Sequence, residues 1–248
     1  MTFAQGLFVT GASATAGLVN AVAGGGTLLT FPSLLLAGLS PVSANATSTV
    51  ALWPGQISSV WAYRRHLGDE RRRALVLGVP ALLGGVIGAT LLLALPERFF
   101  EAVVPWLILF ACFLLALQNP IKRAIGRHAA GNHPAVLWMI QFFISIYGGY
   151  FGAGIGILML AAMGILLSSS LQHANALKVL FALLSNASGF VLFLLSGKVD
   201  VHVAALMAVA SLAGGFIGAL VAQKLKPEAM RGFAILVGLV AAAKFLFR

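Results

Sequence analysis

Long apolar runs cover most of this 248-residue chain and leave few charged residues between them. A bilayer core about 30 Å thick is spanned by a helix of about 20 apolar residues, and eight runs are of that order of length or longer. They lie at about 6–38, 43–62, 74–95, 99–117, 135–167, 172–196, 201–222 and 230–247. The sequence therefore predicts an all-α polytopic membrane protein, with the lipid bilayer as its surroundings.

The composition supports this fold class and excludes several others. Hydrophobic residues make up 60% of the chain and charged residues 9%, whereas a soluble domain has about 25% charged residues. A net charge of +10 would suggest nucleic acid in a soluble protein, but here most basic residues lie between apolar runs, where they orient helices. The single cysteine, Cys112, excludes an intramolecular disulfide and a cysteine-based metal site. We expect no nucleic-acid partner, metal or cofactor.

Two of the eight runs are too long for one straight helix, and both have a glycine cluster near the middle. The first cluster is Ala23-Gly24-Gly25-Gly26-Thr27, and the second extends from Gly148 to Gly156. A run of 33 residues would form a rod of roughly 50 Å, and glycine lets the backbone leave the helix. Each run is predicted to be a broken or re-entrant helix whose break is covered by protein or lines a cavity.

The second half of the chain repeats motifs of the first half at a spacing near 130 residues. Ala44-Asn45-Ala46 returns as Ala174-Asn175-Ala176, the Gly-Gly-x-Ile-Gly-Ala motif at 84–89 returns at 214–219, and the glycines at 24–26 return as Gly152-Ala153-Gly154. We predict two homologous repeats of four helical segments each, residues 1–117 and 135–248, in which the first segment is the broken one. A cytoplasmic junction loop, residues 118–134, joins them.

The loop charges give the orientation only in part. Five arginines between Arg64 and Arg73 place that loop in the cytoplasm, as the basic residues of the junction do for the junction. Each broken run could either return to the side from which it entered, as a hairpin, or cross the membrane. Both arrangements place eleven basic residues on the cytoplasmic side and four on the other side, so the charge rule does not distinguish them. Only hairpins leave three crossings per repeat and make the two halves inverted, as in many secondary transporters, and we favour this arrangement.

The residues from Gly24 to Pro32, the Ser-Pro turn with the Asn-containing helix at 40–49, and their echo from Gly148 to Lys178 resemble the sulfite exporter TauE/SafE family. The resemblance covers nearly the whole chain. It implies a transporter that exports a small sulfur-containing anion, sulfite or an organosulfonate, across the bacterial inner membrane. The second half departs from the first, because Gly152-Ala153-Gly154 replaces three consecutive glycines.

The glycine clusters also predict an anion site made by the backbone. A half-helix that begins inside the membrane directs unpaired N–H groups and a positive dipole end beyond the break, which suits an anion without any side chain. We expect substrate contacts near the membrane midplane from Gly24, Gly25, Gly26 and Thr27 in the first repeat and from Gly152, Ala153 and Gly154 in the second. The glycines at 84, 88, 214 and 218 are interpreted instead as sites of close helix packing.

The helix after each break carries a polar stripe that adds six candidate binding residues. At about 100° per residue, one face of the first such helix collects Asn45, Thr49 and Gln56, and the matching face of the second collects Asn175, Lys178 and Asn186. Polar residues in a membrane are expected to face the bundle interior, so this stripe is predicted to line the transport path. The alternative is that these residues only bond helices together.

Lys178 stands out as a basic residue inside an apolar run and away from a membrane edge. All six acidic residues are expected in loops or at helix ends, so a ligand anion could supply the charge that Lys178 lacks, with snorkelling as the alternative. Proton and sodium pumps usually carry a carboxylate within the membrane, and an inside-negative potential alone drives a monovalent anion outward. We therefore predict electrogenic efflux. His173, in the place of Ser43, is interpreted as interfacial, with proton coupling as the alternative.

Three other functions stay open from the sequence: a transporter or channel for another small solute or cation, a membrane-assembly scaffold, and an intramembrane enzyme. The enzyme is disfavoured because the chain has no His-Glu-x-x-His motif, and Gly11-Ala12-Ser13-Ala14 lacks the last glycine of a Gly-x-Ser-Gly nucleophile motif. No catalytic residue is expected. The glycine-rich helix faces are compatible with a homodimer.

Overall fold

A computed structural model describes residues 3–22, 25–124, 134–166, 171–221 and 227–247. The regular elements within these ranges are all α-helices, as the apolar runs predict. In chain order they are α1 (Phe3–Val22), α2 (Thr27–Leu36), α3 (Pro41–Ala62), α4 (Arg64–Asp69), α5 (Arg71–Ala94), α6 (Glu97–Ala124), α7 (Pro134–Tyr150), α8 (Ile155–Leu166), α9 (Leu171–Leu195), α10 (Val201–Val221) and α11 (Pro227–Leu246).

Both overlong apolar runs are broken at their glycine clusters, which confirms that part of the prediction. The first break separates α1 from α2 across residues 23–26, and the second separates α7 from α8 across residues 151–154. Gly25, Gly152 and Gly154 have φ values of +92°, +78° and +76°, in a region that residues with a Cβ rarely adopt. The chain therefore leaves the helix where glycine makes this possible.

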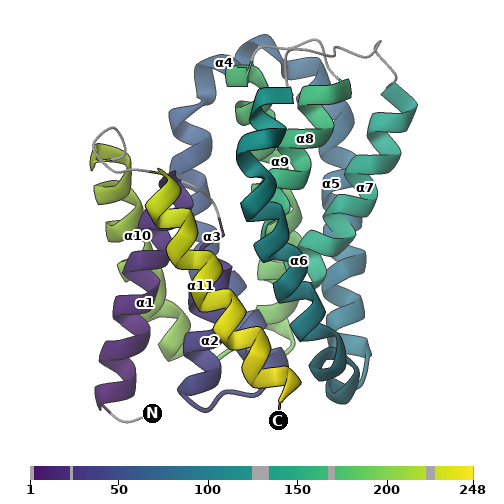
Figure 1. Cartoon of the computed structure of the whole chain (residues 1–248). Coiled ribbons are helices and arrows are strands. Elements are labelled where there is room, and N and C mark those ends of the chain that lie inside the picture. The colour runs from purple at the N-terminus through teal and green to yellow at the C-terminus, as the bar shows by residue number, and fades with distance from the viewer. Residues whose placement is uncertain (1–2, 23–24, 125–133, 167–170, 222–226, 248) are drawn as a thin grey trace.

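Each broken run folds back on itself as a hairpin (Figure 1). In this view α1 rises from the lower end of the bundle and α2 returns to it, whereas α7 descends from the upper end and α8 returns there. Side-chain contacts agree, because Ser13 Oγ on α1 donates to Met207 O on α10 at 2.7 Å, and Gly17 packs on Ser211 one turn further along both helices. Thus α1 and α10 start at the same end and run side by side.

The remaining long helices run between the two ends of the bundle (Figure 1). In the figure α3, α6 and α10 run upward, α5, α9 and α11 run downward, and the N- and C-terminal ends both lie at the lower end. The short helix α4 lies at the upper end, beside the arginines that the sequence places in the cytoplasm.

Helices from the two halves of the chain interlock through glycine. The hairpin helix α7 packs on α5, and α1 packs on α10. A Cβ added to Gly84, Gly88 or Gly214 would collide with backbone atoms of the facing helix, so these glycines permit an approach that no larger residue allows. The interpretation of these three as packing residues is confirmed, while the surroundings of Gly218 lie outside the described residues.

Positions separated by 130 residues meet where α3 crosses α9. Trp53 Nε1 donates to Leu183 O at 3.2 Å, and Asn186 Nδ2 donates to Gln56 Oε1 at 3.2 Å. In both pairs the two residues are 130 positions apart, which is the spacing of the repeated motifs.

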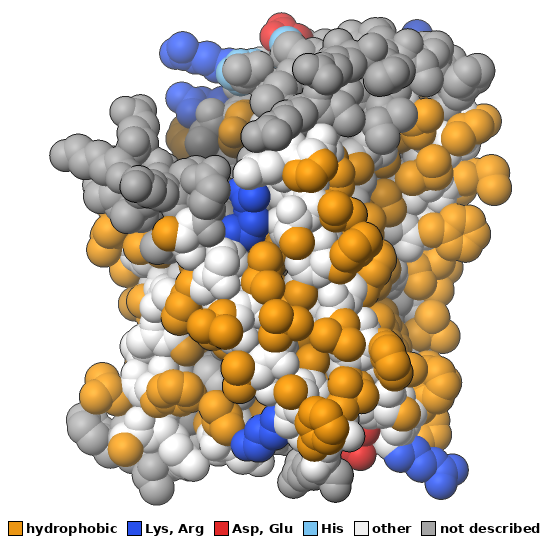
Figure 2. Space-filling view, viewed as in Figure 1, with side chains coloured by type: hydrophobic (Ala, Val, Ile, Leu, Met, Phe, Trp, Pro, Cys, Tyr) orange, Lys and Arg blue, Asp and Glu red, His pale blue; other side chains and the backbone are white. Residues whose placement is uncertain are grey.

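The outer surface of the bundle is apolar between its ends. Figure 2 shows hydrophobic side chains over the side of the molecule, with charged side chains mostly near the upper and lower ends. Among the described residues, Arg71–Ala94, Glu97–Ile121 and His173–Leu195 are long and apolar enough, by length and composition, to cross a membrane. Shorter apolar helices lie at Thr27–Leu36, Ala135–Tyr150 and Val201–Ile217. The predicted class of all-α membrane protein fits these findings.

Two features at the upper end differ from the prediction. α6 continues to Ala124, so the predicted junction loop, residues 118–134, begins as helix, and Gln118 in it is buried. A helix that extends beyond the hydrocarbon core no longer needs apolar side chains. These last turns of α6 are polar, and for that reason the sequence pattern predicted a loop there. The sequence analysis also did not predict α4. Residues 125–133 of the junction lie outside the described residues.

Candidate functional site

Lys178 lies beside the first turn of the half-helix that follows the second break. A Cβ built on Gly156 would lie 3.5 Å from Lys178 Cδ, so the lysine side chain passes over the N-terminal end of α8. Lys178 Nζ donates to Asn175 Oδ1 at 3.0 Å, which orients the ammonium group. The end of α8 carries the positive side of the helix dipole. Two positive features therefore come together, and the sequences of α3, α5, α7, α8 and α9 contain no acidic residue.

Asn186, two turns beyond Lys178 on α9, lies against the break itself. Its side chain is buried, and Asn186 Oδ1 lies 3.7 Å from the position that a Cβ of Gly152 would occupy. Asn186 Nδ2 is bonded to Gln56 on α3, as described above. Close by, Thr49 Cγ2 lies 3.5 Å from the Cβ position of Gly189. The polar stripes of α3 and α9 thus face each other inside the bundle, as predicted.

Asn45, on α3, binds the last residue of α7, where the second break begins. It is fully buried, its Nδ2 donates to Tyr150 O at the end of α7 at 3.0 Å, and Thr49 Oγ1 donates to Asn45 O at 2.9 Å. Asn45 Oδ1 and the Tyr150 hydroxyl are both buried without a hydrogen-bond partner among the described residues. Because a buried polar atom left unbonded costs about 1–3 kcal/mol, these two oxygens are suited to bind a ligand or water.

Aromatic rings anchor the second break to the rest of the bundle. Phe151, the first residue after α7, is fully buried, and its ring meets the edge of Phe31 with centroids 5.5 Å apart. Phe100 on α6 lies 6.3 Å from the Phe151 ring, and the Tyr147 hydroxyl donates to Ala153 O. These contacts hold the residues of the break in one conformation, because large rings fill the space around them.

The first break differs from the second in how its half-helix begins. Gly26 N–H, at the start of α2, donates to Asn20 Oδ1 at 2.7 Å, so a side chain of α1 already occupies one of the N–H groups. Asn20 is exposed and Gly26 is buried. With the spacing of 128 that aligns the two breaks, Asn20 corresponds to Gly148, which has no side chain to cap α8. The two breaks are therefore not equivalent.

Both breaks reach α6 at the same level. A Cβ on Gly25 would lie 2.9 Å from Leu115 Cδ1, and a Cβ on Gly154 would lie 3.4 Å from Leu114 Cδ1. Since Leu114 and Leu115 are adjacent, the two breaks lie at one depth in the bundle. Gly24 lies outside the described residues, and Thr27, the first residue of α2, is half-buried.

The structure thus divides the residues predicted from the sequence into two groups. Asn186, bonded to Gln56, lies against Gly152 at the second break, and Lys178, bonded to Asn175, lies at the first turn of α8. Asn45 bonds the end of α7, and Thr49 bonds Asn45 and contacts the Cβ position of Gly189. Gly25, Gly26 and Thr27 lie at the first break, next to Leu115. The sequence analysis missed Asn20 and Tyr150. An asparagine in an otherwise apolar run, a few residues before a glycine cluster, was a usable signal for Asn20, whereas nothing in the sequence indicated the unbonded hydroxyl of Tyr150.

Comparison with known proteins gives a match over nearly the whole chain. The family described as "Sulfite exporter TauE/SafE" matches residues 9–245. A "Probable membrane transporter protein" of Haemophilus influenzae is 28% identical over 94% of this chain and 91% of its own length. "Probable membrane transporter protein YfcA" of Escherichia coli K12 is 27% identical over 94% of this chain and 86% of its own length. A "Probable membrane transporter protein ORF9" of a Sinorhizobium species is 25% identical over 97% and 91%.

Proposed function

The chain belongs to the sulfite exporter TauE/SafE family and is a membrane transporter, and from this premise we propose that it exports a small sulfur-containing anion, sulfite or an organosulfonate, across the bacterial inner membrane. The observation that carries the proposal is the position of Lys178 at the first turn of α8. A lysine at the centre of a membrane helix costs about 2.5–3.5 kcal/mol on insertion scales. An anion held between its ammonium group and the positive end of the α8 dipole offsets part of that cost.

The substrate site proposed here is at the second break. The positive end of the α8 dipole and the ammonium group of Lys178 attract the anion's charged oxygens, while Asn175 holds the lysine in place. The Ile155 and Ile157 N–H groups donate to Gly152 O and Gly154 O within the turn. The amide pair of Asn186 and Gln56 borders the site on the α3 side. Asn45 and the Tyr150 hydroxyl offer two more polar atoms, which can bind a hydroxyl or a water carried with the anion. At the first break, direct binding of the anion to residues 24–27 stays a prediction, because Asn20 already bonds one N–H there.

The proposal includes an inverted duplication, with residues 1–117 and 135–248 as the two repeats. Contacts between counterparts support it: Trp53 with Leu183 and Gln56 with Asn186 on the α3–α9 crossing. On the α6–α11 crossing, Ile108 Cγ2 lies 3.5 Å from the Cβ position of Gly238, again 130 residues away. A residue touches its own counterpart only near an axis that relates the two halves. Transporters of this kind expose a midplane site alternately to the two sides by rocking one part against the other.

Efflux is proposed to be driven by the membrane potential. The sequences of α3, α5, α7, α8 and α9 contain no acidic residue, and those of α6, Glu97 and Glu101, lie in its first two turns at the lower end of the bundle. No carboxylate of these helices therefore lies at the site to carry a coupled proton or sodium ion. An inside-negative potential contributes about 2.3 kcal/mol per charge per 100 mV, equivalent to a concentration ratio of about 50-fold. This is enough to expel a monovalent anion without coupling.

A second candidate is transport of a neutral or cationic solute on the same scaffold. The unbonded buried oxygens of Asn45 and Tyr150 favour it. Carbonyl and hydroxyl oxygens can coordinate a cation, and they can accept a hydrogen bond from a donor group of a neutral solute. In this reading Lys178 would stabilise the fold through Asn175 rather than bind substrate.

Ligand protection of the purified protein tests the proposal. The protein in detergent is heated with sulfite, an alkyl sulfonate, sulfate, chloride, sodium or no addition, and unfolding is followed by dye labelling of Cys112, which is buried in the folded state. We expect protection by sulfite or the sulfonate, its loss in Lys178→Met and its retention in Lys198→Met, because Lys198 is exposed at the lower end. Protection by sodium alone, or equal anion protection in Lys178→Met, would favour the second candidate.

A further inference from the structure

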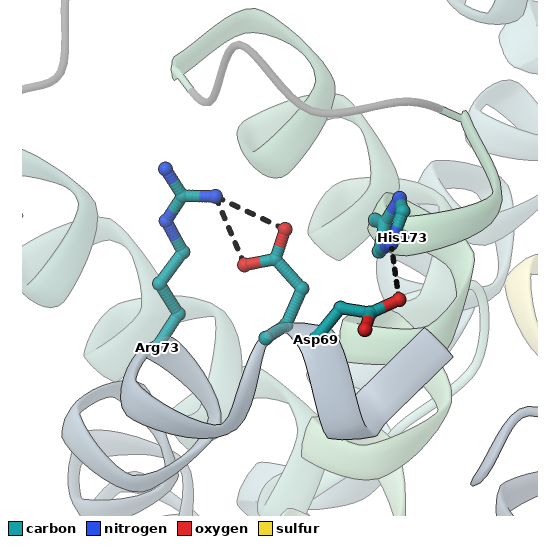
Figure 3. Close-up of polar contacts among 4 residues, drawn as sticks. Asp69, Arg73 and His173 are labelled. Carbon is teal, nitrogen blue, oxygen red and sulfur yellow. Dashed lines mark hydrogen bonds and ion pairs between the residues drawn. The ribbon is translucent and has the colours of Figure 1, made fainter. Parts of the chain in front are cut away.

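Contacts at corresponding positions close the two ends of the bundle, but their chemistry differs. At the lower end Ser43 Oγ, near the start of α3, donates to Lys198 O, just before α10, at 2.7 Å. The counterpart of Ser43 at a spacing of 130 is His173, near the start of α9. At the upper end His173 Nε2 lies 3.3 Å from Asp69 Oδ2 (Figure 3), and Asp69 ends α4 just before α5. A neutral hydrogen bond at one end is thus replaced by a histidine–carboxylate pair at the other.

The His173–Asp69 pair joins α9 to an element with little apolar anchorage. α4 packs on α9, α3 and α5, yet none of its six residues is buried. Elements with few buried contacts open locally at low free-energy cost. His173 lies two residues before Asn175 and five before Lys178 on the same helix, so α4 contacts the part of α9 that carries the proposed site.

The charged and titratable groups around His173 come from the elements that pack against α9. His66 on α4 meets the His173 ring edge-on with centroids 5.5 Å apart, its Nδ1 is buried without a partner among the described residues, and its ring lies 6.1 Å from that of Tyr63. Glu70 is paired with Arg73 at 2.9 Å (Figure 3), which leaves Asp69 as the carboxylate directed at the histidine. The sequence of α8 contributes no charged group.

We propose that Asp69 and His173, with the His66 ring packed against that of His173, form a proton-sensitive latch that holds α4 against α9 at the arginine-rich end of the bundle. Histidine changes charge between about pH 5 and 8, and a protonated His173 forms an ion pair with Asp69, whereas the neutral ring retains only a hydrogen bond. The lower end, with its Ser43 contact, has no such dependence. The inference rests on the proposed function and deepens it, because α9 carries both His173 and the Lys178 of the proposed site.

The expected effect is modest because the pair is partly solvated. The Asp69 side chain is 73% exposed and that of His173 27%, and exposed ion pairs change an equilibrium by about 1.5- to 5-fold. The ratio of latched to open protein is therefore expected to rise by that factor as the pH falls from about 8 to about 6.

Distances between spin labels test the latch without any substrate. Labels are placed at Gly68→Cys on α4, where a Cβ meets nothing within 4 Å, and at Ala135→Cys, exposed at the start of α7. The background carries Cys112→Ala, and the protein is reconstituted in nanodiscs. We expect a short-distance population that grows on acidification. In His173→Gln and Asp69→Asn the populations are expected to be independent of pH, and His202→Gln, a histidine at the lower end, is expected to behave like the parent.

Two results would overturn the latch: populations in the parent that do not change with pH, or a pH response that survives in both His173→Gln and Asp69→Asn. Sulfite flux measured in parallel separates this inference from the proposed function. Without sulfite flux at any pH, the proposed function fails while the distance measurement still decides the latch. Flux whose pH dependence disappears in His173→Gln supports both.

Discussion

Gly88 gives the sharpest structural prediction, because its replacement by alanine acts directly on the interlocked halves. A Cβ on Gly88 would collide with the backbone of Ile146 and lie 2.7 Å from the Tyr150 amide nitrogen. Backbone atoms of a packed helix cannot rotate away, so α7 must move from α5. Overpacking of this kind costs about 1–3 kcal/mol, against which the helix propensity of alanine returns up to about 1 kcal/mol. We expect Gly88→Ala to be destabilised by about 1–2 kcal/mol.

Gly55→Ala is the matched control for Gly88→Ala. Gly55 also lies inside a long helix, α3, but a Cβ there meets nothing within 4 Å, so only the propensity gain of up to about 1 kcal/mol applies. The assay is the temperature at which Cys112, buried in the folded protein, becomes reactive toward a thiol dye. Gly88→Ala should react at a lower temperature than the parent and Gly55→Ala at an equal or higher one. Equal temperatures for the two variants would refute the packing argument.

Three further changes probe the breaks and the α3–α9 crossing. Asn20→Ala should destabilise the protein by about 1 kcal/mol because the Gly26 N–H loses its cap, whereas Thr15→Ala, which removes only a bond to Gly11 O within α1, should cost less; the Cys112 assay distinguishes them. Gly154→Ala should cost about 1–3 kcal/mol in the same assay because of its positive φ, and Gly156→Ala, in ordinary contact with Lys178, should cost less. Trp53→Phe should lose about 1 kcal/mol with its hydrogen bond across the crossing; an unchanged midpoint would show that this bond contributes nothing.

The sequence predicted the helices well because hydrophobic thickness and glycine act locally. Apolar runs of known length gave the long helices, and the glycines at 25, 152 and 154 gave the breaks, since each has the backbone conformation that glycine tolerates best. Whether each broken run returns or crosses was harder to predict, because the number of basic residues on each side of the membrane is the same for hairpins and for crossings. Only packing decides it, through contacts such as Ser13 with Met207, which are 194 residues apart.

The candidate site could be predicted by residue type but not by grouping. The polar stripe on each helix is a periodic pattern, so Gln56, Asn186 and Lys178 were found. The cap that distinguishes the two breaks could not be predicted: Asn20 caps α2, while Gly148, 128 positions later in the sequence, has no side chain to cap α8. Such a cap involves a residue outside the matched motifs. The contact of His173 with Asp69 likewise depends on α4, which lies in a charged stretch without apolar periodicity.

Sulfite efflux from proteoliposomes under an imposed potential tests the central claim most directly. Vesicles loaded with sulfite are given an inside-negative potential by a potassium gradient with valinomycin, and the parent is compared with Lys178→Met and Lys198→Met. We expect efflux that rises with the potential in the parent and in Lys198→Met and is lost in Lys178→Met. Efflux that ignores the potential, or that Lys178→Met supports as well as the parent, would contradict it.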